Sequence, residues 1–244
     1  MTEITHGTLF GGRIRHDQPR QGFRSGIEPV LLAASLPAQP GEMVLEGGTG
    51  SGAALLCLAA RVPGVGGVGV EIDPSQAALA AANMAANGFT GVRVVQDDLT
   101  TMRLEGRFDH AMANPPYHAA GGTESPDIAR ERAKRGDPDL LDVWAMALAR
   151  TLRHRGTLTF ILPAWQIPAC LVALAAAGAP AAAIMPLWPR AGVPAKLTII
   201  RGIKGGRSPL SVLPGLALHG PDGRFTDQTD AILRLGEALP LTDR

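Results

Sequence analysis

The chain has 244 residues, of which 45% are hydrophobic and 18% are charged, and its formal net charge is +1. This composition excludes a disordered or fibrous chain, and the balanced charge gives no argument for a general polyanion binder. The two cysteines, Cys57 and Cys170, cannot build a disulfide framework, and they lie in apolar helical segments typical of a core.

The amino-terminal residues 1–40 are predicted to form an irregular, arginine-rich extension with one short apolar helix at residues 29–36. We expect this extension to pack on a single domain of residues 41–244, on its substrate side. It lacks the pattern of a signal peptide, and the long uncharged stretch at residues 156–189 is broken by prolines. We therefore expect a cytoplasmic protein without a membrane span.

From residue 41 onwards, short apolar runs typical of buried strands alternate with helical periodicity. The predicted strands are residues 43–45, 67–72, 92–95, 108–113, 158–162, 182–185 and 197–201. The predicted helices include residues 53–61, 74–87 and 137–153. This alternation indicates an α/β fold with a doubly wound, mostly parallel, seven-stranded sheet, in which ligands bind beyond the carboxyl ends of the strands.

The first strand runs into a glycine-rich loop, Glu46-Gly47-Gly48-Thr49-Gly50-Ser51-Gly52. Glycines let the backbone turn sharply and approach a ligand closely, and the next helix offers amide groups. Gly48, Gly50 and Ala53 have dinucleotide-binding spacing, whereas Glu46 with Gly48, Gly50 and Gly52 has the spacing of S-adenosylmethionine (SAM) enzymes. A tight turn without a ligand is the third reading, and the loop alone does not decide.

The second strand ends in a carboxylate, Glu71, about 20 residues beyond the glycines, where an acid accepts hydrogen bonds from ribose hydroxyls. Its neighbour Ile72 is a further candidate cofactor contact, and Asp73 is the expected cap of the helix at residues 74–87.

The third strand is followed by two acids. Asp98 is favoured to accept a hydrogen bond from an adenine amino group, because Leu99 would then pack against the adenine. Asp97 is the close alternative.

The fourth strand ends in Asn114-Pro115-Pro116-Tyr117. Two prolines fix an extended turn and remove two backbone donors, so this edge is rich in acceptors: the Asn114 side chain and the Pro115 carbonyl. Two fixed acceptors on a flat amino group would favour its pyramidalisation and direct its lone pair at an electrophile. Tyr117 offers an aromatic face for stacking.

With these residues in order, the chain resembles the class I SAM-dependent methyltransferases that carry the Asn-Pro-Pro-Tyr signature of amino-group methylation. The segments 9–13, 22–28, 121–123 and 218–226 are similar to the bacterial tRNA N6-adenine methyltransferase family, whose best-known members modify an adenosine beside the anticodon of a valine tRNA. The resemblance runs from about residue 9 to residue 233.

The resemblance implies SAM as cofactor and tRNA as substrate. The implied cofactor contacts are Glu46, Gly48, Thr49, Gly50, Gly52, Glu71, Ile72, Asp98, Leu99 and Asn114, and the catalytic residues are Asn114, Pro115 and Tyr117. Candidate substrate contacts are Pro116, Tyr117, His118, Arg13, Arg24, Arg130 and Arg132. Arg130 and Arg132 are equally consistent with a solvated helix face.

Three alternatives remain open at this stage: a release-factor glutamine methyltransferase with the same signature, a non-catalytic SAM- or RNA-binding module, and a nicotinamide dehydrogenase. The shortness of the segment before residue 29 argues against the first. The histidines show no metal-ligand spacing, so we expect no metal, and we expect a monomer or weak dimer.

Overall fold

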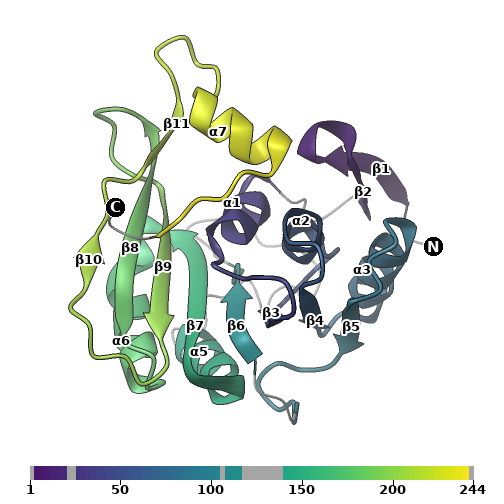
Figure 1. Ribbon diagram of the computed structural model, residues 1–244, viewed down its shortest axis with the longest axis horizontal. Helices are drawn as coiled ribbons and strands as arrows, with labels where there is room; N and C mark the ends of the chain where they lie inside the picture. The colour runs from purple at the N-terminus through teal and green to yellow at the C-terminus, as the bar shows by residue number, and fades with distance from the viewer. Residues whose placement is uncertain (1–2, 21–25, 105–107, 117–139, 242–244) are drawn as a thin grey trace.

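A computed structural model of the chain describes residues 3–20, 26–104, 108–116 and 140–241. One nine-stranded sheet runs through the molecule in the order β10-β8-β9-β7-β6-β3-β4-β5, with β11 pairing to β8 (Figure 1). Its strands are β3 (Met43–Gly47), β4 (Gly66–Glu71), β5 (Val92–Gln96), β6 (Phe108–Ala113), β7 (Leu152–Pro163), β8 (Ala181–Arg190), β9 (Leu197–Ile203), β10 (Ser211–Val212) and β11 (Leu216–His219).

The seven strands from β8 to β5 in this sheet order are those that the sequence predicts. Neighbouring strands from β5 through β7 are parallel, whereas β9 is antiparallel to both β7 and β8. The sheet is therefore mostly parallel and doubly wound, with β3 and β6 side by side at the point where the strand order reverses. The two short strands β10 and β11, which are not predicted from the sequence, extend the sheet beyond β8.

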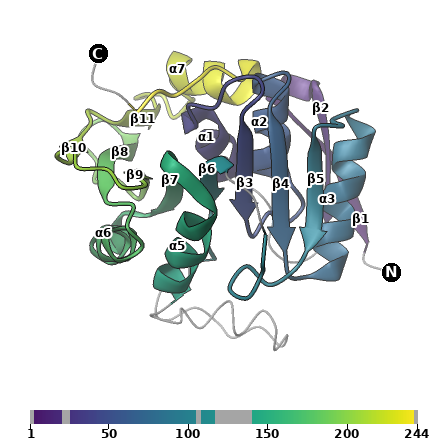
Figure 2. The ribbon, with the colours of Figure 1, turned by 60° about the horizontal axis from the view of Figure 1, so that its bottom comes forward.

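Helices cover both faces of this sheet (Figures 1 and 2). One face carries α1 (Glu28–Ser35), α2 (Ala53–Arg61) and α3 (Pro74–Ala86), and the other carries α5 (Leu140–Thr151) and α6 (Ile167–Ala176). Outside α1 lies α7 (Asp227–Asp230), which continues as a π-helical turn, η3 (Ala231–Leu235).

The core has two parts, one on each face of the sheet. Leu31 of α1 and Leu55 of α2 belong to the first, and both are fully buried. Leu148 of α5, Phe160 of β7 and Leu174 of α6 belong to the second, and they are also fully buried. Among the helices of the described ranges, none is long and apolar enough to cross a membrane.

Local signals fix where the helices near the strand ends begin. Gly52 has φ +90° immediately before α2. Asp73 caps α3, because its Oδ1 accepts hydrogen bonds from the amides of Ser75 and Gln76, and Pro74 occupies the first turn. The predicted cap is confirmed.

The expectation of an irregular amino-terminal extension is wrong. Strands β1 (Ile4–Leu9) and β2 (Ile14–Pro19) form an antiparallel hairpin, joined by a short 3-10 turn, η1 (Phe10–Gly12). The hairpin was missed because its strands bury few apolar side chains and show little hydrophobic alternation. The helix predicted at residues 137–153 also ends earlier than expected, since Leu152 already belongs to β7.

Candidate active site

The carboxyl ends of four parallel strands lie at one edge of the sheet. Gly47 at the end of β3 pairs with Val70 of β4 on one side and with Ala113 of β6 on the other. Glu71 in turn pairs with Gln96 at the end of β5. The loops that follow these strands, which contain the predicted cofactor and transfer residues, therefore begin side by side.

The glycine-rich loop after β3 requires glycine for two different reasons. Gly48, Gly50 and Gly52 all have positive φ, at +65°, +55° and +90°, where side chains other than glycine are strained. A Cβ on Gly48 would lie 2.6 Å from Cη2 of Trp144, whereas a Cβ on Gly50 would meet nothing within 4 Å. Gly48 is thus packed against α5, and Gly50 borders open space that a ligand can fill.

Glu46 lies beneath this loop as a buried carboxyl group. It is 3% exposed, and Thr49 Oγ1 donates a hydrogen bond of 2.5 Å to its Oε2. Burial raises the pKa of Glu46 to about 8; the hydrogen bond from Thr49 opposes this, and the charge of Glu71 adds to it. The carboxyl group is therefore largely protonated at neutral pH, and a bound cation nearby would favour its ionisation.

Glu71 connects the ends of β3 and β4. Its Oε2 accepts a 2.8 Å hydrogen bond from the amide of Gly50, and its Oε1 accepts one of 3.0 Å from the amide of Asp73. Each oxygen keeps a lone pair for a further donor. The adjacent Ile72 is 65% exposed, which leaves an apolar side chain free for a planar ligand.

The two acids after β5 have different surroundings. Asp97 Oδ1 accepts a hydrogen bond from the amide of Asp98, and Asp98 Oδ1 accepts two from Thr100, through its amide and hydroxyl. Leu99 is 5% exposed, and its side chain packs where a Cβ on Gly47 would lie. Leu99 therefore packs from inside the core against the end of β3, where the glycine-rich loop begins.

Asn114 follows directly on Ala113, which pairs with Gly47 at the start of the glycine-rich loop. Asn114 is half-buried, and Pro115 after it is buried. This brings the acceptor-rich end of β6 next to the glycine-rich loop. Tyr117, His118, Arg24, Arg130 and Arg132 lie outside the described residues.

Arg13 is the one predicted substrate contact that the structure describes away from this edge. Its Nη2 donates a 3.0 Å hydrogen bond to the carbonyl of Arg234, and its guanidinium lies 5.5 Å from the centre of the Phe10 ring. These contacts join η1 to η3, on the side of the molecule where Figure 2 shows α7, away from the arrowheads of β3 and β4.

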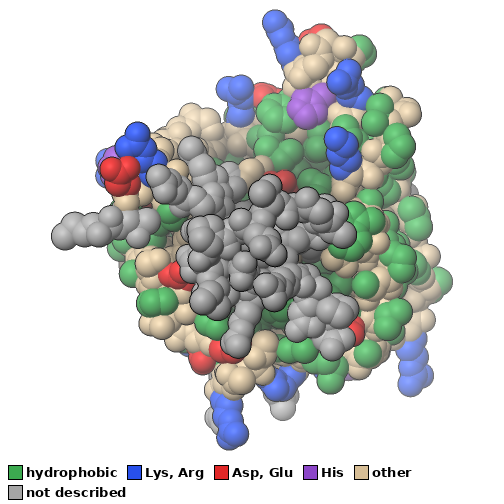
Figure 3. All heavy atoms as spheres, turned by 180° about the vertical axis from the view of Figure 1, so that it is seen from behind, with side chains coloured by type: hydrophobic (Ala, Val, Ile, Leu, Met, Phe, Trp, Pro, Cys, Tyr) green, Lys and Arg blue, Asp and Glu red, His purple; other side chains and the backbone are tan. Residues whose placement is uncertain are grey.

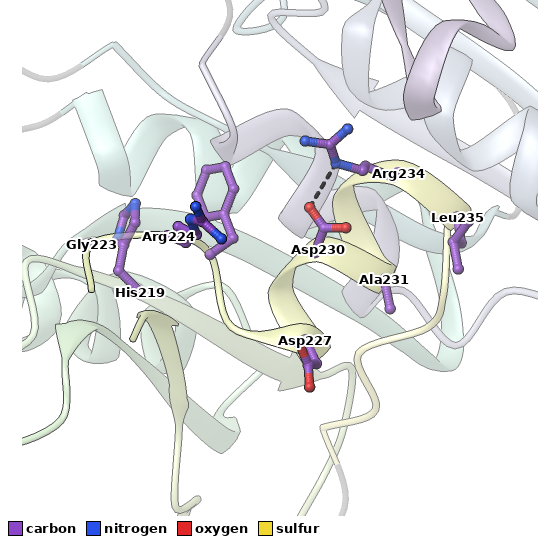
Figure 4. Close-up of a pocket in the computed structure, with 9 residues that line it drawn as sticks. His219, Gly223, Arg224, Asp227, Asp230, Ala231, Arg234 and Leu235 are labelled. Atoms are coloured by element: carbon purple, nitrogen blue, oxygen red, sulfur yellow. Dashed lines mark hydrogen bonds and ion pairs between the residues drawn. The ribbon is translucent and has the colours of Figure 1, made fainter. Parts of the chain in front are cut away.

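A cavity of about 690 Å³ opens beside α7 (Figure 4). It is lined by His219, Gly223, Arg224, Phe225, Asp227, Asp230, Ala231, Arg234 and Leu235. Within it, Arg234 Nε forms an ion pair with Asp230 Oδ1 at 2.6 Å, and the rings of His219 and Phe225 stack at 4.8 Å. None of the strand-end residues described above lines this cavity.

The face seen from behind in Figure 3 shows described basic side chains mainly at its margin and hydrophobic ones gathered toward the β8–β10 edge. Within the described residues, no group of three or more His, Cys, Asp or Glu side chains is arranged to hold a metal ion.

Two residues that touch the glycine-rich loop were not predicted as site residues from the sequence. Trp144 lies in the helix predicted at residues 137–153, and its contact with Gly48 depends on how α5 packs on the sheet. His16 has no metal-ligand spacing in the sequence, yet its Nε2 lies 2.9 Å from Ser51 Oγ. The local signal for a buried His16 is its spacing of two residues from Ile14, which places both side chains on the buried face of β2.

Comparison with known proteins gives the family. The Methyltransferase small domain family matches residues 28–138. A protein of Aeromonas hydrophila named tRNA1(Val) (adenine(37)-N6)-methyltransferase is 30% identical over 216 residues, which cover 87% of this chain and 89% of the relative. The chain belongs to the same methyltransferase family as this relative.

Other family members match over shorter stretches. The enzyme of the same name from Tolumonas auensis is 33% identical, over 66% of this chain and 68% of its own length. One from Bacteroides thetaiotaomicron is 31% identical, but the chain spans only 60% of its length.

Solved structures agree on the fold. A predicted O-methyltransferase from Agrobacterium tumefaciens has a TM-score of 0.71 at 21% identity, over 87% of this chain and 98% of its own. A TehB-like SAM-dependent methyltransferase from Corynebacterium glutamicum has a TM-score of 0.52 at 17% identity, over 74% and 89% of the two chains. The fold is that of the class I methyltransferases, whose methyl donor is SAM.

Proposed function

We propose that this protein transfers a methyl group from SAM to N6 of an adenosine in tRNA, in the cytoplasm. The observation that carries the proposal is the position of Asn114 and Pro115 beside the glycine-rich loop, at the switch point between β3 and β6. Family membership supports the substrate, since the relatives are named for adenine N6 in a tRNA.

The residues at the strand ends fit SAM. Gly50 borders open space, Glu71 has both oxygens oriented by backbone amides, and Ile72 is an exposed apolar side chain next to it. Glu71 would hold the ribose hydroxyls, Ile72 would contact the adenine, and Glu46 would balance positive charge from below the loop. When bound, SAM supplies an electrophilic methyl group on a sulfonium sulfur.

The residues after β6 act on the acceptor. The Asn114 side-chain oxygen and the Pro115 carbonyl would accept hydrogen bonds from the two protons of the adenine amino group. Holding both protons favours a pyramidal nitrogen and fixes the direction of its lone pair, which is a contribution of orientation and preorganised electrostatics. We assign Tyr117, in the same signature, to stacking on the target base. Pro116 and His118, with Arg24, Arg130 and Arg132, are proposed to contact the RNA.

The test is to incubate the protein with methyl-labelled SAM and total bacterial tRNA, and separately with a bacterial release factor. The tRNA is then digested to nucleosides and the release factor to peptides. We expect label in N6-methyladenosine and none in the release factor. Label in a glutamine residue would instead assign the protein to glutamine methylation, and label in neither would refute methyl transfer to both classes of acceptor.

A further inference from the structure

The amino-terminal hairpin is fixed to α3 by two side-chain amides spaced one helical turn apart. Asn83 accepts a hydrogen bond from the Asp17 amide and donates one to the Asp17 carbonyl, both at 2.9 Å. Asn87 does the same for Arg15, at 2.9 and 2.8 Å. Because these four bonds satisfy the backbone of alternate residues of β2, they fix the register of the hairpin on the helix.

This docking turns His16, the residue between the two anchors, toward the interior. His16 is 1% exposed, and its Nε2 lies 2.9 Å from the hydroxyl oxygen of Ser51. Burial lowers the pKa of His16 to about 4, an effect that the charge of Asp17 partly opposes, so the imidazole is neutral at physiological pH.

Ser51 belongs to the glycine-rich loop, and its hydroxyl and carbonyl groups are both held from outside that loop. Its hydroxyl bonds to His16 of the hairpin, and its carbonyl accepts a 2.9 Å hydrogen bond from Nδ2 of Asn83. The glycines on either side, Gly50 and Gly52, have the most conformational freedom of any residue type, so order in this segment has to come from such bonds.

We propose that His16 is a positioning residue of the cofactor site, which acts through Ser51 to hold the glycine-rich loop in the conformation that binds SAM. The inference rests on the proposed function in that the cofactor is SAM. It assigns the hairpin to the cofactor side of the site, whereas the sequence alone suggested the substrate side. A loop released from His16 has to be ordered during binding, which weakens affinity without any lost contact to the ligand.

The test compares SAM affinity by titration calorimetry in five variants. His16→Phe keeps an aromatic ring but removes the hydrogen bond, Ser51→Ala removes the bond from the other side, and His16→Gln keeps a polar nitrogen near the position of Nε2. The double variant His16→Phe/Ser51→Ala measures whether the two residues act as one unit. Asn87→Ala is the matched control, since it weakens hairpin docking at Arg15 and does not touch Ser51.

We expect His16→Phe, Ser51→Ala and the double variant each to raise the SAM Kd by about tenfold, the effect of one buried hydrogen bond. His16→Gln and Asn87→Ala should stay within about threefold of wild type, and kcat at saturating SAM should be retained. Without cofactor, the amides of the loop should exchange hydrogen faster in His16→Phe than in Asn87→Ala.

Equal SAM affinity in wild type, His16→Phe and Ser51→Ala would overturn the inference, and so would an equal loss in Asn87→Ala. Ser51→Ala leaves the hairpin core intact, so it tests the bond even where His16→Phe fails to fold. A wild-type protein that binds no SAM would overturn the proposed function, and this inference with it.

Discussion

Gly48 and Gly50 are two residues apart, and the structure predicts different consequences for placing a methyl group on each. Both have a positive φ, so alanine at either position carries a backbone strain of about 1–2 kcal/mol. In a chain of this length that strain lowers Tm by about 2–4 °C. Beyond this shared cost, the two positions differ in what the new methyl group meets.

The Cβ of Gly48→Ala would lie 2.6 Å from the Trp144 ring, well inside van der Waals contact. Overpacking of this kind costs about 1–3 kcal/mol in addition to the strain, so its Tm loss should be roughly twice that of Gly50→Ala. Trp144→Leu combined with Gly48→Ala should recover part of the difference, because the smaller side chain makes room for the methyl group.

The Cβ of Gly50→Ala meets no protein atom within 4 Å, so its stability loss should be limited to the backbone strain. In the proposed site, however, that open space is occupied by SAM. The same overpacking of about 1–3 kcal/mol then acts on binding, which is roughly a 5- to 150-fold rise in Kd.

The assay is thermal unfolding and SAM titration of both variants in parallel. Gly50→Ala should show the smaller Tm loss together with weakened SAM binding. Wild-type SAM affinity in Gly50→Ala would refute the assignment of this space to the cofactor, whatever happens to stability.

Three further predictions concern the site and the core. Glu71→Gln should raise the SAM Kd by about tenfold in calorimetry. The carboxylate accepts backbone hydrogen bonds on both of its oxygens, whereas the amide has only one acceptor oxygen. An unchanged Kd would show that Glu71 does not bind the ribose. Urea unfolding across pH should show opposing effects of two buried groups. The pKa of His16 is lowered from 6.5 to about 4, so this residue makes the free energy of unfolding rise with pH between 4 and 6.5. The pKa of Glu46 is raised from 4.5 to about 8, so this residue makes the free energy of unfolding fall with pH between 4.5 and 8. Above pH 6.5 only the Glu46 effect remains, so wild type should lose about 2 kcal/mol by pH 8 and Glu46→Gln should not; parallel curves for the two proteins would contradict the buried, protonated state. Phe160→Ala should lower the free energy of unfolding by about 3–5 kcal/mol, since Phe160 is fully buried, whereas Val172→Ala, at a side chain that is 66% exposed, should change it by less than about 0.5 kcal/mol.

The periodicity of the sequence was sufficient to predict the seven central strands and most of the helices, because each buried strand is a short apolar run and each of these helices has an apolar face. It was also sufficient to bring Glu46, Glu71 and Asn114 together, since the carboxyl ends of parallel strands meet at one edge. The hairpin β1–β2 was not predicted, because its attachment depends on amide groups of Asn83 and Asn87 far along the chain.

The contacts that shape the glycine-rich loop were likewise beyond the sequence. The bond from His16 to Ser51 joins residues 35 positions apart, and Trp144 reaches Gly48 only because α5 packs against the end of β3. The raised pKa of Glu46 follows from burial, which a strand-end acid does not reveal in sequence. Such features depend on tertiary packing, whereas strand ends and turns are encoded locally.

Asn114→Ala tests the central claim most directly, because it removes one of the two acceptors proposed to hold the amino group and leaves the glycine-rich loop and Glu71 in place. Methyl transfer to tRNA is measured in a single turnover at saturating SAM, alongside the SAM Kd of the same variant. The account predicts that the transfer rate falls by about a hundredfold or more while the Kd stays within about threefold of wild type. A transfer rate near that of wild type would contradict it.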